Sequence, residues 1–106
     1  WDSTSSNKGA FFMSVPSNAT YRAMEPVASH WKQHNQLGES LISGLKSAGV
    51  KIYSKGSMEM DLTQTSYSTI PSVDIELGDK ASDHSGARLE TLANGLLAGV
   101  NTFFGQ

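Results

Sequence analysis

Hydrophobic and polar residues alternate most clearly over residues 70–79, which read IPSVDIELGD. An alternation with a period of two is typical of a strand, and it predicts one over residues 72–77. Glu76 then lies near the end of that strand, two positions before Gly78, where the chain can turn away. Open α/β sheets carry functional side chains at such strand ends. The alternation by itself favours the simpler interpretation, in which Glu76 belongs to the solvent-facing side of an amphipathic strand.

A long segment in the first half of the chain has apolar residues three and four positions apart, the spacing of an amphipathic helix. Because proline is tolerated only in the first turn of a helix, Pro26 predicts a start near Glu25. Lys46 followed by Gly49 is typical of a helix C-terminus. Gly38 weakens the middle of this helix and predicts a bend there.

The last segment has the most regular apolar pattern in the chain. Ser85 is a suitable N-cap and Gly105 a suitable terminator, so a helix is predicted between them. Its apolar stripe predicts packing against the core rather than a cofactor-binding surface. The stripe consists of Leu89, Leu92, Ala93, Leu96, Leu97, Val100, Phe103 and Phe104.

The remaining segments complete the predicted order of elements. Residues 1–9 are rich in Ser, Thr and Asn and predict a flexible lead-in. Residues 10–15 are an apolar run closed by proline, which predicts a buried strand, and residues 50–53 predict a brief one. Residues 54–69 predict a polar loop that holds one short strand or turn. We therefore expect one α/β domain over residues 10–106, a small sheet of about three to four strands packed by the long middle helix and the C-terminal amphipathic helix.

Composition excludes several classes of function. The chain has 106 residues, a formal net charge of −2 and eight scattered basic residues, which argues against a nucleic-acid partner. No apolar run approaches the roughly 20 residues of a membrane span, so none is expected. Cysteine is absent, which excludes disulfides and thiol catalysis.

Two short motifs contain residues that are common in catalytic and metal sites. His30 and His34 are four positions apart, as in helical zinc sites, but the Glu that follows the first His in metalloproteases is missing. We interpret them as two solvated histidines on a polar helix face. Residues 83–85 read Asp-His-Ser, but adjacent residues cannot adopt the geometry of a catalytic triad. Asp79 and Asp83 are expected to satisfy backbone donors and the positive end of the dipole of the last helix.

Several stretches together resemble a known family. Residues 70–78, Asp83 and a helix that ends in GVNTFF at residues 99–104 are similar to the closing part of the zinc-dependent N-acetylmuramoyl-L-alanine amidases. Residues 12–19 (FMSVPSNA) are similar to the family's strand that reads apolar-Ser-Ile-His-Ala-Asn-Ala, and residues 35–41 resemble the helix before its next strand. The resemblance extends over nearly the whole chain and corresponds to the second half of a family domain.

The resemblance implies cleavage of the amide bond between the peptidoglycan sugar and its peptide stem. It assigns Glu76 the role of catalytic general base beside a zinc-bound water, where a carboxylate can accept and return a proton. Pro16 stands where the family has a zinc-binding His, and the other two ligands would precede Trp1. Catalytic zinc needs about three protein ligands, and the resemblance identifies no metal ligand in this chain.

Two functions follow from the resemblance. The first is a peptidoglycan amidase-like domain that hydrolyses, or formerly hydrolysed, the N-acetylmuramoyl-L-alanine bond and is inactive as this chain alone. The second is a non-catalytic cell-wall-binding or assembly module, in which Ser17, Asn18 and the loop at residues 54–69 hold a glycopeptide. Either function implies an extracellular or cell-envelope location.

A chain that matches half of a domain is expected to expose a sheet edge. The missing N-terminal half or a partner chain would then cover that edge. If the resemblance is accidental, the chain is a small α/β interaction domain. Its candidate contact residues are Trp31, Tyr53, Met58 and Met60.

Overall fold

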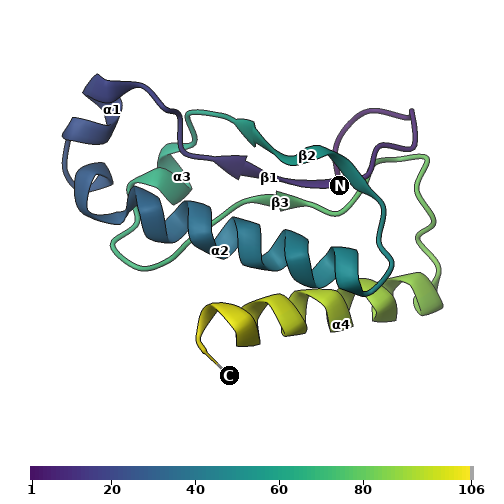
Figure 1. Ribbon diagram of the computed structural model, residues 1–106. Helices are drawn as coiled ribbons and strands as arrows, with labels where there is room; N and C mark the ends of the chain where they lie inside the picture. The colour runs from purple at the N-terminus through teal and green to yellow at the C-terminus, as the bar shows by residue number, and fades with distance from the viewer. Residues whose placement is uncertain (106) are drawn as a thin grey trace.

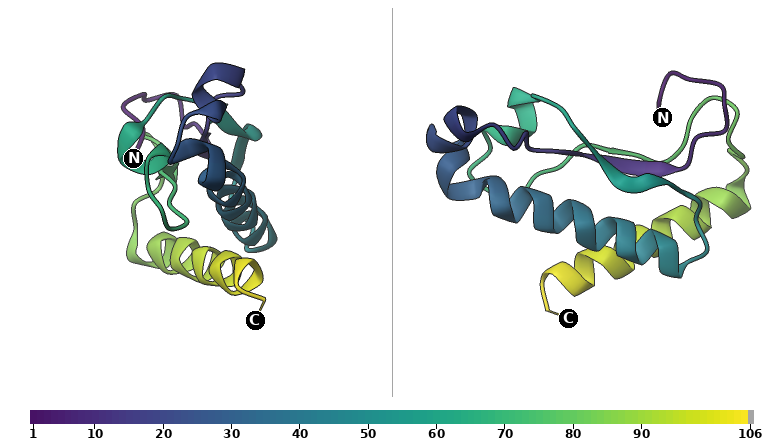
Figure 2. Two further views of the ribbon diagram at one scale, coloured as in Figure 1. Left: turned by 90° about the vertical axis from the view of Figure 1, so that its left-hand side faces the viewer. Right: turned by 45° about the horizontal axis from the view of Figure 1, so that its top comes forward.

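Three strands and four helices make up the computed structural model, which describes residues 1–105 (Figure 1). Both long helices lie on one side of the sheet, α2 directly below the strands and α4 beyond it (Figures 1 and 2). The predicted α/β fold with a small sheet and two packing helices is confirmed. In chain order the elements are β1 (Ala10–Ser14), α1 (Ala19–Ala23), α2 (Val27–Ser47), β2 (Ile52–Glu59), α3 (Thr63–Ser66), β3 (Ile75–Glu76) and α4 (Gly86–Phe103).

The central strand of the sheet is β1, which lies between β2 and β3. It runs parallel to β2 and antiparallel to β3. The strand predicted over residues 72–77 is therefore an edge strand of two residues, Ile75 and Glu76. One reason for its late start is that the N–H of Ser72 donates to the His34 ring, 3.0 Å away, instead of to a neighbouring strand.

The second strand is longer than its alternation indicates. The predicted brief strand at residues 50–53 extends as β2 to Glu59, into the segment predicted as a loop, and α3 follows. Ser54 and Gly56 both have positive φ, 51° and 87°, and the register with β1 shifts between Ala10 and Phe12. These two residues accommodate a bulge, which interrupts the period-two alternation of the strand.

The helix α2 packs against the sheet through Gly38. A Cβ atom at this position would collide with the ring of Phe12 in β1. The glycine thus lets helix and strand approach closely, and α2 runs through it as one helix of 21 residues. At its end Gly49 has φ +89°, as the predicted stop requires.

Backbone touches backbone where α2 crosses α4. A Cβ at Gly99 would lie 2.6 Å from both the Cα of Leu41 and the carbonyl oxygen of Ser40, and one at Gly95 would lie 2.9 Å from the Cα of Leu45. Gly44 faces these two glycines from α2. No side chain larger than hydrogen fits at this crossing.

This crossing rotates the apolar stripe of α4 away from the position that its spacing predicts. Leu92 is buried among Ala10, Leu45 and Val50, and Leu96 is partly buried beside them. The prediction that the whole stripe faces the core is wrong, because the glycine face of the helix takes that place. Large parts of four stripe residues are exposed: Leu89 (46%), Leu97 (59%), Val100 (37%) and Phe104 (62%).

A buried carboxylate organises the first residues of the chain. Asp79 has no exposed surface and accepts hydrogen bonds from the Thr4 hydroxyl (2.7 Å), the N–H groups of Ser6 (3.1 Å) and Lys8 (2.9 Å), and the N–H of Ala81 (3.0 Å). Burial by itself raises the pKa of Asp79, but these hydrogen bonds together lower it far below its usual value. Residues 1–9, predicted as a flexible lead-in, are thus tied to the domain through this side chain.

No helix within residues 1–105 combines the length and the apolar character needed to cross a membrane.

Candidate functional site

Glu76 lies at the end of β3, next to the beginning of β1. It pairs with Phe11 across the two strands. Its side chain is 19% exposed, and its Oε2 atom makes no hydrogen bond within residues 1–105. The nearest cation is the amino group of Trp1, 3.3 Å from that oxygen.

Ser17 lies beyond the opposite end of β1. Its N–H donates to a Glu59 carboxylate oxygen at 2.7 Å, and its hydroxyl lies 3.2 Å from both oxygens of the same carboxylate. These bonds tie the loop after β1 to the end of β2. Because both donors of Ser17 are already used, its role in the described structure is to hold this loop in place.

Asn18 caps the short helix α1 by accepting a hydrogen bond from the N–H of Tyr21 at 2.9 Å. It also lines a shallow, open pocket of about 400 Å³ between α1 and the segment after β2. Neither this helix nor the pocket was predicted from the sequence, although Asn18 before a short helical turn is an N-cap signal. The pocket is lined by Pro16, Asn18, Thr20, Tyr21, Met24 and Asp61.

Arg22 fixes the loop at Pro16 from the other side. Its Nε donates to the carbonyl oxygen of Pro16 (2.7 Å) and its Nη2 to that of Val15 (2.9 Å). The guanidinium carbon lies 3.7 Å from the centre of the Trp31 ring, a cation–π contact. The Asn35 side chain accepts from the N–H of Val15 at 2.8 Å. The backbone at Pro16, where the amidase resemblance would place a metal-binding His, is therefore held in place by the side chains of Arg22 and Asn35.

The structure does not bring the predicted catalytic and substrate-binding residues together. Because β3 is antiparallel to β1, Glu76 pairs with Phe11 at the start of β1, whereas Ser17 and Asn18 follow its end. Six positions separate Phe11 from Ser17, which is on the order of 20 Å of extended chain. Glu76 and the Asn18 pocket are thus two separate places on the molecule.

His34 is buried, with 2% of its surface exposed, so the prediction of two solvated histidines is wrong for this residue. Its Nδ1 accepts the N–H of Ser72, and its Nε2 has no hydrogen-bond partner within residues 1–105. Burial lowers the pKa of His34, only partly opposed by the backbone at Ser68. His30 is half-buried and its Nδ1 lies 2.8 Å from the Pro26 carbonyl oxygen. His34 is buried because the segment before β3 packs against this face of α2.

Residues 83–85 have structural roles. Asp83 accepts a hydrogen bond from the N–H of Ser85 (2.9 Å), and the Ser85 hydroxyl caps α4 by accepting from the N–H of Arg88 (3.2 Å). The Nε2 of His84 lies 2.9 Å from the Asp79 carbonyl oxygen, and its ring stacks on that of Trp1 with centres 4.0 Å apart. The predicted N-cap at Ser85 and the predicted roles of Asp79 and Asp83 as acceptors for backbone donors are confirmed.

The residues at the predicted positions do not fit a zinc ion. Pro16 offers no ligating side-chain atom, and Glu76 lies at the other end of β1. Within residues 1–105, no three His, Asp or Glu side chains converge as a metal site requires. We therefore derive no step that involves zinc.

Comparison of this chain with protein-family models, with curated proteins and with solved structures finds no match.

Proposed function

We propose that this chain is an amidase-like cell-wall domain that binds peptidoglycan glycopeptide in the pocket beside Asn18. The observation that carries the proposal is the location of this pocket, directly after β1, at the segment whose sequence resembles the family's Ser-Ile-His-Ala-Asn-Ala strand end. A volume of about 400 Å³ is within the range of small-molecule sites. It suits one sugar ring with a short peptide attached.

The lining of the pocket supports a ligand that is both polar and apolar. Tyr21, Met24 and Pro16 offer apolar surface, and Asn18 and Asp61 offer amide and carboxylate groups at the rim. An acylated sugar presents hydroxyl and amide groups around a ring with apolar faces, which matches such a surface. The bonds from Ser17 to Glu59 and from Arg22 to Pro16 hold the pocket wall in place before any ligand arrives.

The proposal is tested by sedimentation of the purified chain with insoluble peptidoglycan. We expect Asn18→Ala and Asp61→Ala each to weaken binding about fivefold, which is the effect of losing one hydrogen bond. The matched control is Gln36→Ala, an exposed side chain of α2 outside this pocket. Failure of the unaltered chain to sediment with cell wall contradicts the proposal, and so does equal binding by all three variants.

A second candidate function is hydrolysis of the amide bond with Glu76 as general base. It is favoured by one observation: one carboxylate oxygen of Glu76 is buried, and its close partner is the Trp1 amino group, 3.3 Å away, with no hydrogen bond to any other group of residues 1–105. Hydrolysis on this scaffold further requires a metal site that residues 1–105 do not supply, and a partner chain that supplied it would also cover the outer edge of β2. Both candidates place the chain in the cell envelope or outside the cell.

This second candidate makes a separate prediction. The purified chain with added zinc should release no peptide stems from cell walls, because residues 1–105 hold no donor set for the metal. Release of free peptide amines over time is the measurement. Release that Glu76→Gln abolishes would support Glu76 as general base and would contradict the inactivity that we predict for the chain alone.

A further inference from the structure

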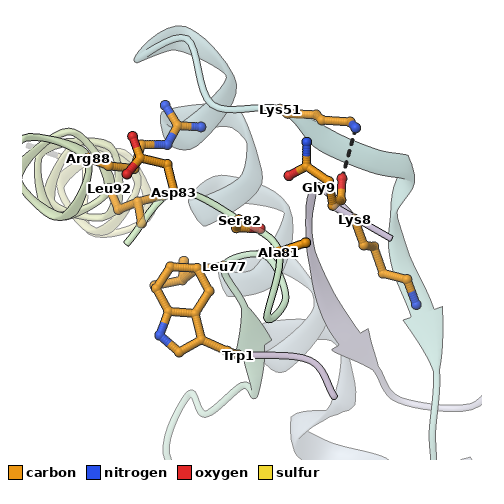
Figure 3. A pocket seen from close by; sticks show the side chains of 11 residues that line it. Trp1, Lys8, Gly9, Lys51, Leu77, Ala81, Ser82, Asp83, Arg88 and Leu92 are labelled. Carbon is orange, nitrogen blue, oxygen red and sulfur yellow. Dashed lines mark hydrogen bonds between the residues drawn. The ribbon is translucent and has the colours of Figure 1, made fainter. Parts of the chain in front are cut away.

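A second cavity lies at the other end of β1 from the Asn18 pocket. Its volume is about 450 Å³ (Figure 3). The cavity is bounded by the N-terminal segment, the beginning of β2 and the first turn of α4. Eleven residues line it, among them Trp1, Leu77, Ser82, Asp83, Arg88 and Leu92.

Three cationic side chains line this cavity, and two of them have partners. The Lys8 ammonium pairs with Asp2 at 3.3 Å, and its side chain extends away from the cavity in Figure 3. The Lys51 ammonium donates to the carbonyl oxygen of Asn7 at 2.9 Å. The guanidinium of Arg88 makes no hydrogen bond and no ion pair with any residue from 1 to 105, although the side chain is half-buried.

The position of the Arg88 guanidinium costs free energy, although its charge interacts with the Asp83 carboxylate and helps to lower the pKa of that group. Arg88 lies in the first turn of α4, where the helix dipole disfavours a positive charge. The one carboxylate in the lining, Asp83, lies beside it in Figure 3 but accepts its hydrogen bond from the N–H of Ser85. The cavity therefore has an excess of positive charge in a chain whose net charge is −2. A bound anion would offset the cost.

Part of the cavity wall is apolar. Figure 3 shows the Trp1 ring beside Leu77, and Leu92 lies toward α4. The Trp1 ring is stacked on the His84 ring, which helps to hold it in position. An inorganic anion would leave this apolar surface unused, whereas an organic carboxylate with an aliphatic or aromatic body would contact both parts of the cavity.

We propose that this cavity binds a small organic carboxylate, of the size of an acylated amino acid or dipeptide, with its carboxylate on Arg88 and its apolar part against Trp1, Leu77 and Leu92. A carboxylate and a guanidinium form two parallel N–H···O bonds, which favours Arg over Lys for this task. The site is separate from the Asn18 pocket and does not depend on the function proposed for that pocket.

The test is a titration of the ¹⁵N-labelled chain with N-acetyl-Ala-Leu and, in parallel, with its C-terminal amide, followed by amide chemical shifts. We expect the acid to shift the amides of Ser82, Asp83 and Arg88 in a saturable manner. The amide form should bind at least tenfold more weakly, because it cannot make the charge-assisted bonds. Equal binding by acid and amide would overturn the proposal, as would shifts located elsewhere.

Variants and a second probe sharpen the result. Arg88→Gln should weaken binding of the acid at least tenfold, and its folding is checked by its own spectrum. Lys32→Gln removes the same charge from an exposed position on α2 and should leave binding unchanged. Inorganic phosphate should shift the same amides far less than the dipeptide acid. If phosphate binds as tightly, the apolar wall has no part in recognition and the assignment to an organic carboxylate is wrong.

Discussion

At the scale of single residues, two buried ionisable groups hold the irregular parts of this chain, and neither can be recognised from local sequence. Asp79 binds the N-terminal segment, and His34 binds the N–H of Ser72 before β3. Both bonds join positions far apart in the sequence, so periodicity carries no sign of them. The caps at Asn18 and Ser85 are different, because their bonds are local and their residue types signal them.

Asp79→Asn is expected to loosen residues 2–8, because an uncharged amide forms weaker bonds with the donors of Thr4, Ser6 and Lys8. Faster hydrogen exchange at the N–H groups of Ser6 and Lys8 is the measurement. The matched control is Asp74→Asn, which changes a half-buried carboxylate that makes no such bonds. Unchanged exchange in Asp79→Asn would show that the segment is held by other contacts.

Because His34 is buried, we expect the free energy of unfolding to fall as the pH is lowered. The folded-state pKa of His34 is lowered by burial, so the unfolded chain binds the proton more readily. The free energy of unfolding should therefore be highest above about pH 6.5 and fall as the pH drops below that value, by at most about 1.4 kcal/mol per pH unit from this one group. Urea unfolding at a series of pH values measures it.

The control for that experiment is the slope of the same plot in His34→Asn. This variant loses some stability at every pH but has no imidazole to protonate at position 34. A slope as steep as that of the unaltered chain would assign the effect to other groups.

At the scale of elements, the helix positions follow from periodicity and the helix orientations do not. The predicted ranges of α2 and α4 agree closely with the structure because apolar spacing, caps and terminal glycines act locally. The face of α4 that packs was predicted wrongly. Large apolar side chains indicate the core face of a helix only where side chains fill the space between that helix and its neighbour. Where α2 crosses α4, Gly44, Gly95 and Gly99 instead bring the two backbones into contact.

Gly99→Ala is expected to destabilise the chain by about 1–3 kcal/mol, because the added methyl group would overlap the backbone of Leu41 and Ser40. Gly86→Ala is the matched control, since a Cβ there meets no atom within 4 Å and alanine favours a helix. Thermal unfolding of both variants measures the difference. Equal midpoints for the two would contradict the close crossing of α2 and α4.

At the scale of the whole molecule, the sheet order decides which proposed roles can act together. The α/β class and about three strands were predictable from the alternation of strand and helix signals. The direction of β3 was not, because alternation is the same in parallel and antiparallel pairs. Its antiparallel pairing with β1 separates Glu76 from Asn18, although the resemblance to the amidases assigns both to one substrate. The resemblance itself stays a prediction.

The central claim is that glycopeptide binds beside Asn18 and not beside Glu76. The most direct measurement is the map of amide chemical shifts on titration with a soluble N-acetylmuramoyl dipeptide, used as its C-terminal amide so that no free carboxylate can bind at Arg88. The account predicts saturable shifts at Asn18, Tyr21 and Asp61, with Leu77 and Glu76 unaffected. Shifts centred on Glu76, or none at any residue, would contradict it.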